Sequence, residues 1–206
     1  MSFQPDRGVT KNAAALFVGR TAVMALSFVL GLYAARLLGL AGFGRYAIAR
    51  MYFDLLLTLG ETGLTILITR EIAKSPRHAP LYLGTAGPLA ICVIEIAGGL
   101  LVLASPALGY GPEVRSMLWL ACVALVPASF ATLSEAVFVA IGHAHYVMFG
   151  TFGEALLYAS TGLVLLSSGH GAQSLFVALV TTRSLLAVFY AIQLWRRFGE
   201  PPRPGS

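Results

Sequence analysis

The chain has 206 residues, of which 57% are hydrophobic and only 11% carry a charge. Soluble domains average about 25% charged residues, so the composition excludes an ordinary soluble domain. The net charge of +5 does not indicate nucleic-acid binding, because the basic residues lie at the ends of apolar runs and form no basic face with interleaved aromatic residues. The apolar residues occur in long blocks and not in alternation, which argues against a membrane β-barrel and favours an all-α membrane protein.

Six apolar runs approach or exceed the roughly 20 residues that a helix needs to cross a bilayer. We predict transmembrane helices at residues 13–38, 43–60 with a short arm to residue 73, 81–104, 114–141, 146–167 and 172–195. The short loops between them predict that consecutive helices pack as antiparallel neighbours. The expected organisation is an N-terminal segment at residues 1–12, a six-helix transmembrane domain at 13–197 and a disordered tail at 198–206.

The distribution of Lys and Arg predicts the orientation in the membrane. Arg36, Arg45 and Arg115 lie on one side of the predicted spans. The other side, which includes both termini, holds Arg7, Lys11, Arg70, Lys74, Arg77, Arg196, Arg197 and Arg203. The positive-inside rule therefore places both termini of a multi-pass membrane protein in the cytoplasm. The first apolar run is too long for the core of a signal peptide, so we interpret it as the first span.

Residues 35–73 form the most informative segment of the sequence. A turn is predicted at residues 38–44, and a break in the second helix is predicted at Gly60-Glu61-Thr62-Gly63. Between them, Arg50, Asp54 and Glu61 recur at helical spacing on one face of an otherwise apolar helix. A broken helix that carries charges is typical of membrane transporters.

Charged residues occur inside all six predicted spans. A charge at the centre of a bilayer costs at least about 2.5–3.5 kcal/mol, so these side chains have to face inward, pair or contact water. They either form interhelical ion pairs or line a cavity that binds a charged substrate. The set comprises three arginines, suited to a phosphate group, and five carboxylates, suited to ion coupling: Arg20, Arg50 and Arg183, then Asp54, Glu61, Glu95, Glu135 and Glu154.

No sequence motif supports an enzyme or a cofactor. The two cysteines, Cys92 and Cys122, lie inside apolar runs without metal-binding or redox spacing. The histidines lie at span ends or in loops, and no HExxH, GxSxG, P-loop or CxxC pattern is present. We therefore expect no metal site, no cofactor and no catalytic activity.

Residues 12–74 resemble the polysaccharide biosynthesis protein family. The resemblance rests first on the turn sequence ARLLGLAGFGRYAIA, beginning at Ala35 and including Gly39, Phe43 and Gly44. It rests next on ETGLTILITREIA, which begins at Glu61 and ends at Ala73. These motifs cover about a third of the chain.

The resemblance implies a flippase that moves lipid-linked oligosaccharide or polysaccharide precursors across the inner membrane by alternating access. Family members carry two six-helix lobes around a central cleft, which implies that this chain corresponds to the N-terminal lobe and is completed by a second lobe or a homodimer. It also implies that cavity arginines, here Arg20, Arg50 and Arg183 by position, engage the pyrophosphate of the lipid carrier. Two alternatives remain: a multidrug/cation antiporter of the same superfamily, and a non-transporting membrane subunit of a polysaccharide-assembly complex.

Overall fold

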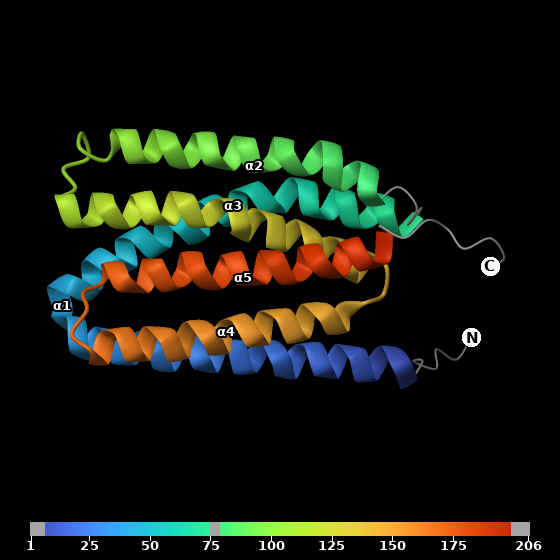
Figure 1. Cartoon of the computed structure of the whole chain (residues 1–206), viewed down its shortest axis with the longest axis horizontal. Helices are drawn as coiled ribbons and strands as arrows, with labels where there is room; N and C mark the ends of the chain where they lie inside the picture. The colour runs from blue at the N-terminus through green and yellow to red at the C-terminus, as the bar shows by residue number, and fades with distance from the viewer. Residues whose placement is uncertain (1–6, 75–78, 199–206) are drawn as a thin grey trace, which may run out of the picture.

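The computed structural model describes residues 7–74 and 79–198, without the side chains of 7–18, 60–69, 73–74, 79–83, 85–86 and 198. The described residues fold into helices with no strand, so the predicted all-α class is confirmed (Figure 1). The helices are α1 (Arg7–Lys74), α2 (Ala79–Ala104), α3 (Pro112–Ala140), α4 (Ala144–Ser167) and α5 (Gln173–Phe198). Helix α1 begins inside the predicted N-terminal segment. Of the predicted tail at 198–206, Phe198 is the last residue of α5, and residues 199–206 lie outside the described residues.

Helix α1 is interrupted at Gly39, where φ is 67° and ψ is 176°. This conformation is confined almost entirely to glycine, which explains why a glycine stands there. The interruption divides α1 into arm 1 (residues 7–38) and arm 2 (residues 40–74), and the chain reverses direction between them (Figure 1). The two arms and α2 to α5 give the six helical segments that the sequence predicts.

The predicted break at Gly60-Glu61-Thr62-Gly63 is wrong. Arm 2 is helical through these residues to Lys74, and Gly39 has the only non-helical backbone inside the described α1. Glycine accepts helical dihedral angles, and within a membrane the helix is favoured because it satisfies every backbone N–H and C=O. Two glycines three residues apart are therefore compatible with a continuous helix.

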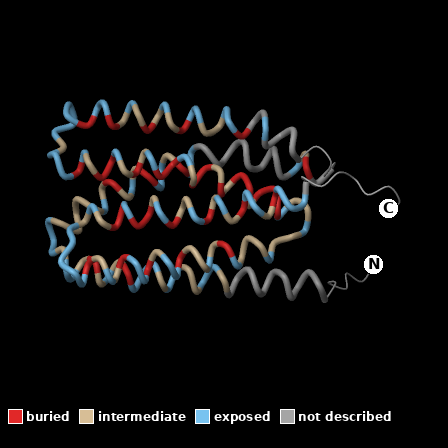
Figure 2. The backbone as a smooth tube through the Cα atoms, viewed as in Figure 1, coloured by how far each residue is buried: buried red, intermediate tan, exposed pale blue. Residues whose placement is uncertain are grey.

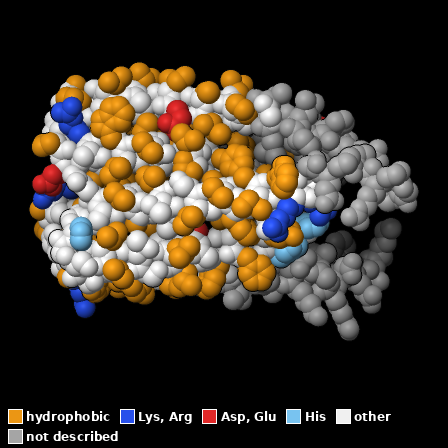
Figure 3. Space-filling model, in the orientation of Figure 1, with side chains coloured by type: hydrophobic (Ala, Val, Ile, Leu, Met, Phe, Trp, Pro, Cys, Tyr) orange, Lys and Arg blue, Asp and Glu red, His pale blue; other side chains and the backbone are white. Residues whose placement is uncertain are grey.

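The described helices are long and apolar enough to cross a membrane. The membrane-length segments are Gly19–Leu59, which covers the end of arm 1 and the start of arm 2, Gly87–Ala104, Pro112–Ala140, Ala144–Ser167 and Gln173–Arg197. Large hydrophobic side chains such as Leu40, Leu103 and Trp195 are exposed, and such residues cover much of the face shown in Figure 3. An apolar surface of this extent needs a lipid environment. The chain is a multi-pass membrane protein.

Helix α3 forms the centre of the bundle and packs between α2, arm 2 and α5, while α4 lies beside arm 1 (Figure 1). The buried residues concentrate along α3 and α5 (Figure 2). Ala121, Ala124, Ala128 and Ala131 of α3 are all buried, and small residues of this kind allow helices to approach closely in lipid. The start of α1 and the end of α5 lie at the same end of the bundle (Figure 1).

Candidate functional site

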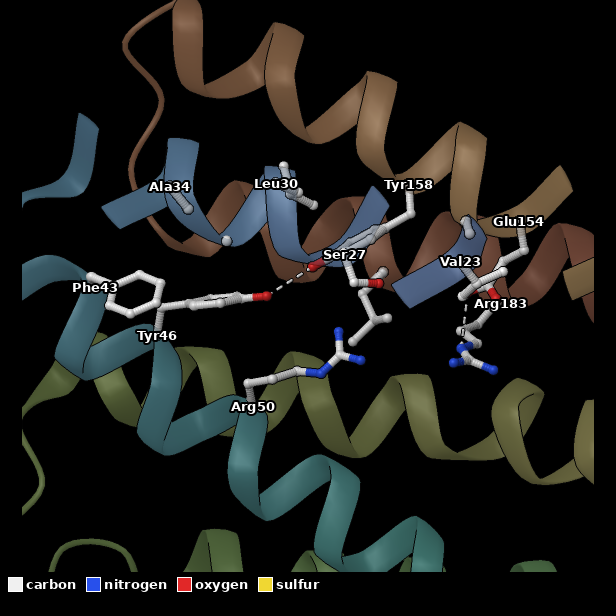
Figure 4. A pocket seen from close by; sticks show the side chains of 13 residues that line it. Val23, Ser27, Leu30, Ala34, Phe43, Tyr46, Arg50, Glu154, Tyr158 and Arg183 are labelled. Carbon is white, nitrogen blue, oxygen red and sulfur yellow. Dashed lines mark hydrogen bonds and ion pairs between the residues drawn. The ribbon is translucent and has the colours of Figure 1, made fainter. Parts of the chain in front are cut away.

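A cavity of about 340 Å³ lies between arm 1, arm 2, α4 and α5 (Figure 4). Small residues of arm 1 and α4, among them Gly31, Ala34 and Ala155, line it and leave the space unfilled. The kink at Gly39 returns arm 2 alongside the other helices, so residues distant in the sequence share the cavity. Its polar lining consists of Ser27, Tyr46, Arg50, Glu154, Tyr158 and Arg183.

Arg50 enters the cavity from arm 2. Its Nε donates hydrogen bonds to both carboxylate oxygens of Asp54, at 3.1 and 3.0 Å, across one helical turn. The guanidinium carbon lies 5.5 Å from the centre of the Phe53 ring and 5.9 Å from that of Tyr158. One carboxylate and two aromatic rings thus fix this guanidinium at the cavity wall, where Figure 4 shows it directed inward.

Arg183 of α5 reaches the cavity close to Glu154 of α4. The Nε of Arg183 lies 3.0 Å from Oε1 of Glu154, and the two side chains are 19% and 11% exposed. The geometry is that of an ion pair without an aligned hydrogen bond, because the Nε–H has no acceptor in hydrogen-bonding position among the described residues. This partly buried pair joins α4 to α5 (Figure 4).

Two tyrosines connect arm 2 to α4 beside Arg50. The hydroxyl oxygens of Tyr46 and Tyr158 lie 3.0 Å apart (Figure 4). The Tyr46 ring also packs against Phe43 and Phe176, with ring centres 6.1 and 5.7 Å away. Our sequence reasoning missed Tyr46 as a site residue. Its only signal is its position within the family turn motif, one helical turn before Arg50.

A shallow groove along arm 2 continues from the cavity and shares Phe43, Tyr46 and Arg50 with it. It runs past Asp54, whose side chain is 53% exposed, to Thr58. Arg50, Asp54 and Thr58 therefore share one face of arm 2, as their spacing predicts. Glu61 follows on the same helix but lies outside the residues whose side chains the structure describes.

The structure places Arg20 and Glu95 away from the cavity. Arg20 of arm 1 is exposed and is not among the lining residues. Glu95 of α2 faces α3, where the Cys122 thiol lies 3.4 Å from its Oε2. Its other oxygen, Oε1, is buried and has no hydrogen-bond partner among the described residues.

Glu135 lies at a second polar contact, between α3, α4 and α5. The hydroxyl of the fully buried Tyr190 donates to Oε1 of Glu135 at 3.1 Å, and the carbonyl oxygen of Val147 lies 3.4 Å from the same hydroxyl. The ring fits because position 150 is a glycine, where an added Cβ would lie 2.6 Å from the Tyr190 hydroxyl oxygen. This contact could not be predicted from the sequence, because nothing distinguishes Tyr190 from other tyrosines near span ends.

The site thus unites Arg50, Asp54, Arg183 and Glu154 and leaves Arg20, Glu95 and Glu135 outside it. In the part of the chain that the structure describes, no three His, Cys, Asp or Glu side chains are placed to hold a metal ion. The arrangement presents two guanidinium groups, each beside a carboxylate, in an open cavity within the membrane-spanning region.

The sequence profile of the polysaccharide biosynthesis protein family matches residues 9–203. The chain belongs to the polysaccharide biosynthesis protein family. The match extends far beyond the motifs at residues 12–74 and confirms the family that those motifs suggest. Comparison with curated protein sequences gives no match.

Among solved structures, this family member is similar to the outward-facing conformation of a multidrug resistance MATE family transporter of the MOP superfamily. The TM-score is 0.75 at 19% sequence identity, and the alignment covers 96% of this chain and 48% of the transporter. At this identity the similarity establishes the fold alone. The chain spans about half the length of that transporter.

Proposed function

We propose that the chain forms one lobe of a transporter that moves lipid-linked oligosaccharide or polysaccharide precursors across the inner membrane by alternating access. In this proposal, Arg50 and Arg183 bind the phosphate groups of the lipid carrier. The observation that carries it is the presence of both guanidinium groups in one cavity within the membrane-spanning region of a polysaccharide biosynthesis family member.

The chemistry of the cavity suits an oxyanion. Guanidinium remains charged at every physiological pH and binds phosphate oxygens through paired N–H donors. Arg50 uses its Nε on Asp54, and its guanidinium lies beside the Tyr158 ring. In this proposal, the guanidinium of Arg50 meets the phosphate in the cavity, and the groove along arm 2 serves as the lateral opening toward lipid.

The carboxylates nearest the arginines are the groups we assign to ion coupling. Asp54 and Glu154 each lie beside a cavity arginine, so a change in their protonation or ion binding alters the charge that a substrate meets. Glu61, Glu95 and Glu135 stay predictions from the sequence.

The exposed face of arm 2 indicates a missing partner surface. Arg50 and Asp54 are 29% and 53% exposed at a depth where the surrounding residues are apolar. Because exposed charges in lipid are costly, we propose that this face borders a central cleft completed by a second six-helix lobe or a second copy of the chain. Positive-inside bias supports cytoplasmic termini for this assembly.

Export of a cell-surface polysaccharide by the complete system tests the proposal. We expect Arg50→Ala to reduce export strongly at unchanged protein level. Arg183→Ala is combined with Glu154→Gln, so that no carboxylate is left without its counter-charge, and this double variant is expected to reduce export as well. Arg115→Ala is the matched control, because Arg115 is an exposed arginine at the start of α3 and does not line the cavity. Export that survives both cavity substitutions would refute the assignment.

One observation favours the antiporter alternative: Asp54 is half exposed in the groove, where it is accessible to an organic cation. Export of ethidium that depends on Asp54 and not on Arg183 would support that function. The third alternative, a non-transporting subunit, predicts loss of complex assembly on removal of the chain, with export unaffected by either arginine substitution.

A further inference from the structure

The charge balance of the cavity sets a condition on phosphate binding. Each of its two arginines already lies beside a carboxylate, Arg50 beside Asp54 and Arg183 beside Glu154. A phosphate group that enters this site therefore meets two arginines whose charges are already balanced by two carboxylates. These carboxylates are as close to the guanidinium groups as the phosphate could come. One of these carboxylates has to lose its charge or leave its arginine for the phosphate to bind closely.

The two carboxylates differ in their access to water. The Asp54 side chain is 53% exposed and lies on the groove side of arm 2, whereas that of Glu154 is 11% exposed between α4 and α5. An exposed carboxylate keeps its charge when its partner is taken, because solvent stabilises it. A buried carboxylate that loses its arginine has no such compensation and favours the neutral form.

The other ionisable groups around Glu154 reinforce this difference. From α5, Arg183 and Tyr190 face it, and Tyr158 lies one turn along α4. From arm 2, Arg50 and Tyr46 face it across the cavity, while arm 1 presents the non-ionisable Val23 and Ser27. From α3, Glu135 lies beyond the Tyr190 hydroxyl. Within the described residues, Arg183 is therefore the one cation in direct contact with Glu154.

We infer that binding of a phosphate group to this cavity is accompanied by protonation of Glu154. The phosphate takes the place of the carboxylate at Arg183, and the carboxylate takes up one proton from water. No other bond forms or breaks. Release of the substrate returns Arg183 to Glu154 and frees the proton. The inference rests on the proposed function and adds the identity of the group that couples substrate to protons.

Isothermal titration calorimetry of the purified full chain in phosphatidylcholine nanodiscs measures this coupling directly. Titration near pH 7 in two buffers of different ionisation enthalpy yields the number of protons taken up per bound ligand. Dodecyl phosphate supplies the proton count, because a phosphate monoester has a second pKa of about 6 and is mostly dianionic near pH 7. Inorganic phosphate, which is a mixture of monoanion and dianion there, is used to compare binding alone. Binding of dodecyl phosphate alone assigns the site to a lipid headgroup, and binding of both assigns it to phosphate in general.

We expect uptake of about one proton per bound phosphate group in the native chain and close to none in Glu154→Gln. Glu95→Gln is the matched control, a carboxyl-to-amide change outside the cavity, and keeps the native value. Because the native value is measured without any substitution, a poorly folded variant does not remove the test.

The failures are distinguishable. Binding to the native chain without proton uptake overturns the inference and leaves the proposed function intact. Uptake that persists in Glu154→Gln also overturns it, because the proton then goes to the phosphate or to another residue. Absence of any phosphate binding overturns the proposed function, and the inference with it.

Discussion

The Tyr190 ring of α5 lies directly against the backbone of Gly150 in α4. A Cβ at position 150 would come within 2.6 Å of the hydroxyl oxygen and 2.8 Å of two ring carbons. Tyr190 is also the largest fully buried side chain of the described residues, and it contacts Glu135 of α3. The packing of α3, α4 and α5 around Tyr190 therefore requires a glycine at position 150.

Gly150→Ala is expected to destabilise the protein, because Tyr190 cannot move without losing its contacts with α3. Overpacking of this kind costs about 1–3 kcal/mol. Gly153→Ala on the same helix is the matched control, since an added Cβ there meets nothing within 4 Å. Thermal unfolding in detergent compares the two. Adding Tyr190→Phe to Gly150→Ala should restore only part of the stability, because the ring carbons still clash. Equal melting temperatures for the two alanine variants would contradict the contact.

Gly39→Ala tests the reversal between the two arms. No atom lies within 4 Å of an added Cβ, so the cost comes from the backbone conformation alone, which is about 1–3 kcal/mol for a residue other than glycine. Gly44→Ala is the control, because Gly44 is helical and equally unobstructed and should gain up to about 1 kcal/mol. Unfolding midpoints that fall for Gly39→Ala and hold or rise for Gly44→Ala are the expected outcome. A tolerated Gly39→Ala would show that the reversal lies elsewhere.

Arg183→Ala is expected to lower stability, because it leaves the largely enclosed Glu154 carboxylate without its counter-charge. Removal of one partner from a fully buried ion pair costs about 3–5 kcal/mol, and the loss here should be smaller because the pair borders the cavity. The double variant Arg183→Ala with Glu154→Gln should recover much of this loss, since no uncompensated charge remains.

The comparison for that variant is Arg45, which pairs with Glu113 near the end of the bundle opposite the termini, with side-chain exposures of 43% and 60%. An exposed pair contributes about 0–1 kcal/mol, so Arg45→Ala should be nearly silent in the same unfolding assay. A double variant as unstable as Arg183→Ala alone would show that the Arg183 side chain stabilises the bundle by packing and not by charge.

The sequence was sufficient for those features that depend on local pattern. Apolar run lengths predict the helices, and the four-residue spacing of Arg50 and Asp54 predicts their shared face. The glycines predict a turn over residues 38–44, but the structure confines it to Gly39 and leaves residues 42–44 helical. The predicted break at Gly60-Glu61-Thr62-Gly63 failed because glycine composition alone does not outweigh the backbone hydrogen bonding that a helix secures in lipid.

Features that depend on tertiary packing could not be predicted. Glu154 and Arg183 each stood out as an intramembrane charge, but their pairing depends on the register of α4 against α5. Tyr46 lines the cavity and contacts Tyr158 only because arm 2 turns back alongside α4 after Gly39. Arg20 lies inside an apolar run like Arg50 and Arg183, so the sequence does not distinguish it from them. In the structure its side chain is exposed and does not line the cavity.

Binding of dodecyl phosphate to the purified full chain in phosphatidylcholine nanodiscs tests most directly whether Arg50 and Arg183 form a phosphate site. Hydrogen bonds to a charged group contribute about 1.5–3 kcal/mol, so each alanine substitution should weaken binding by roughly 10- to 100-fold. Arg115→Ala should bind like the native chain. Dissociation constants for Arg50→Ala and Arg183→Ala that match the native value would contradict the phosphate site.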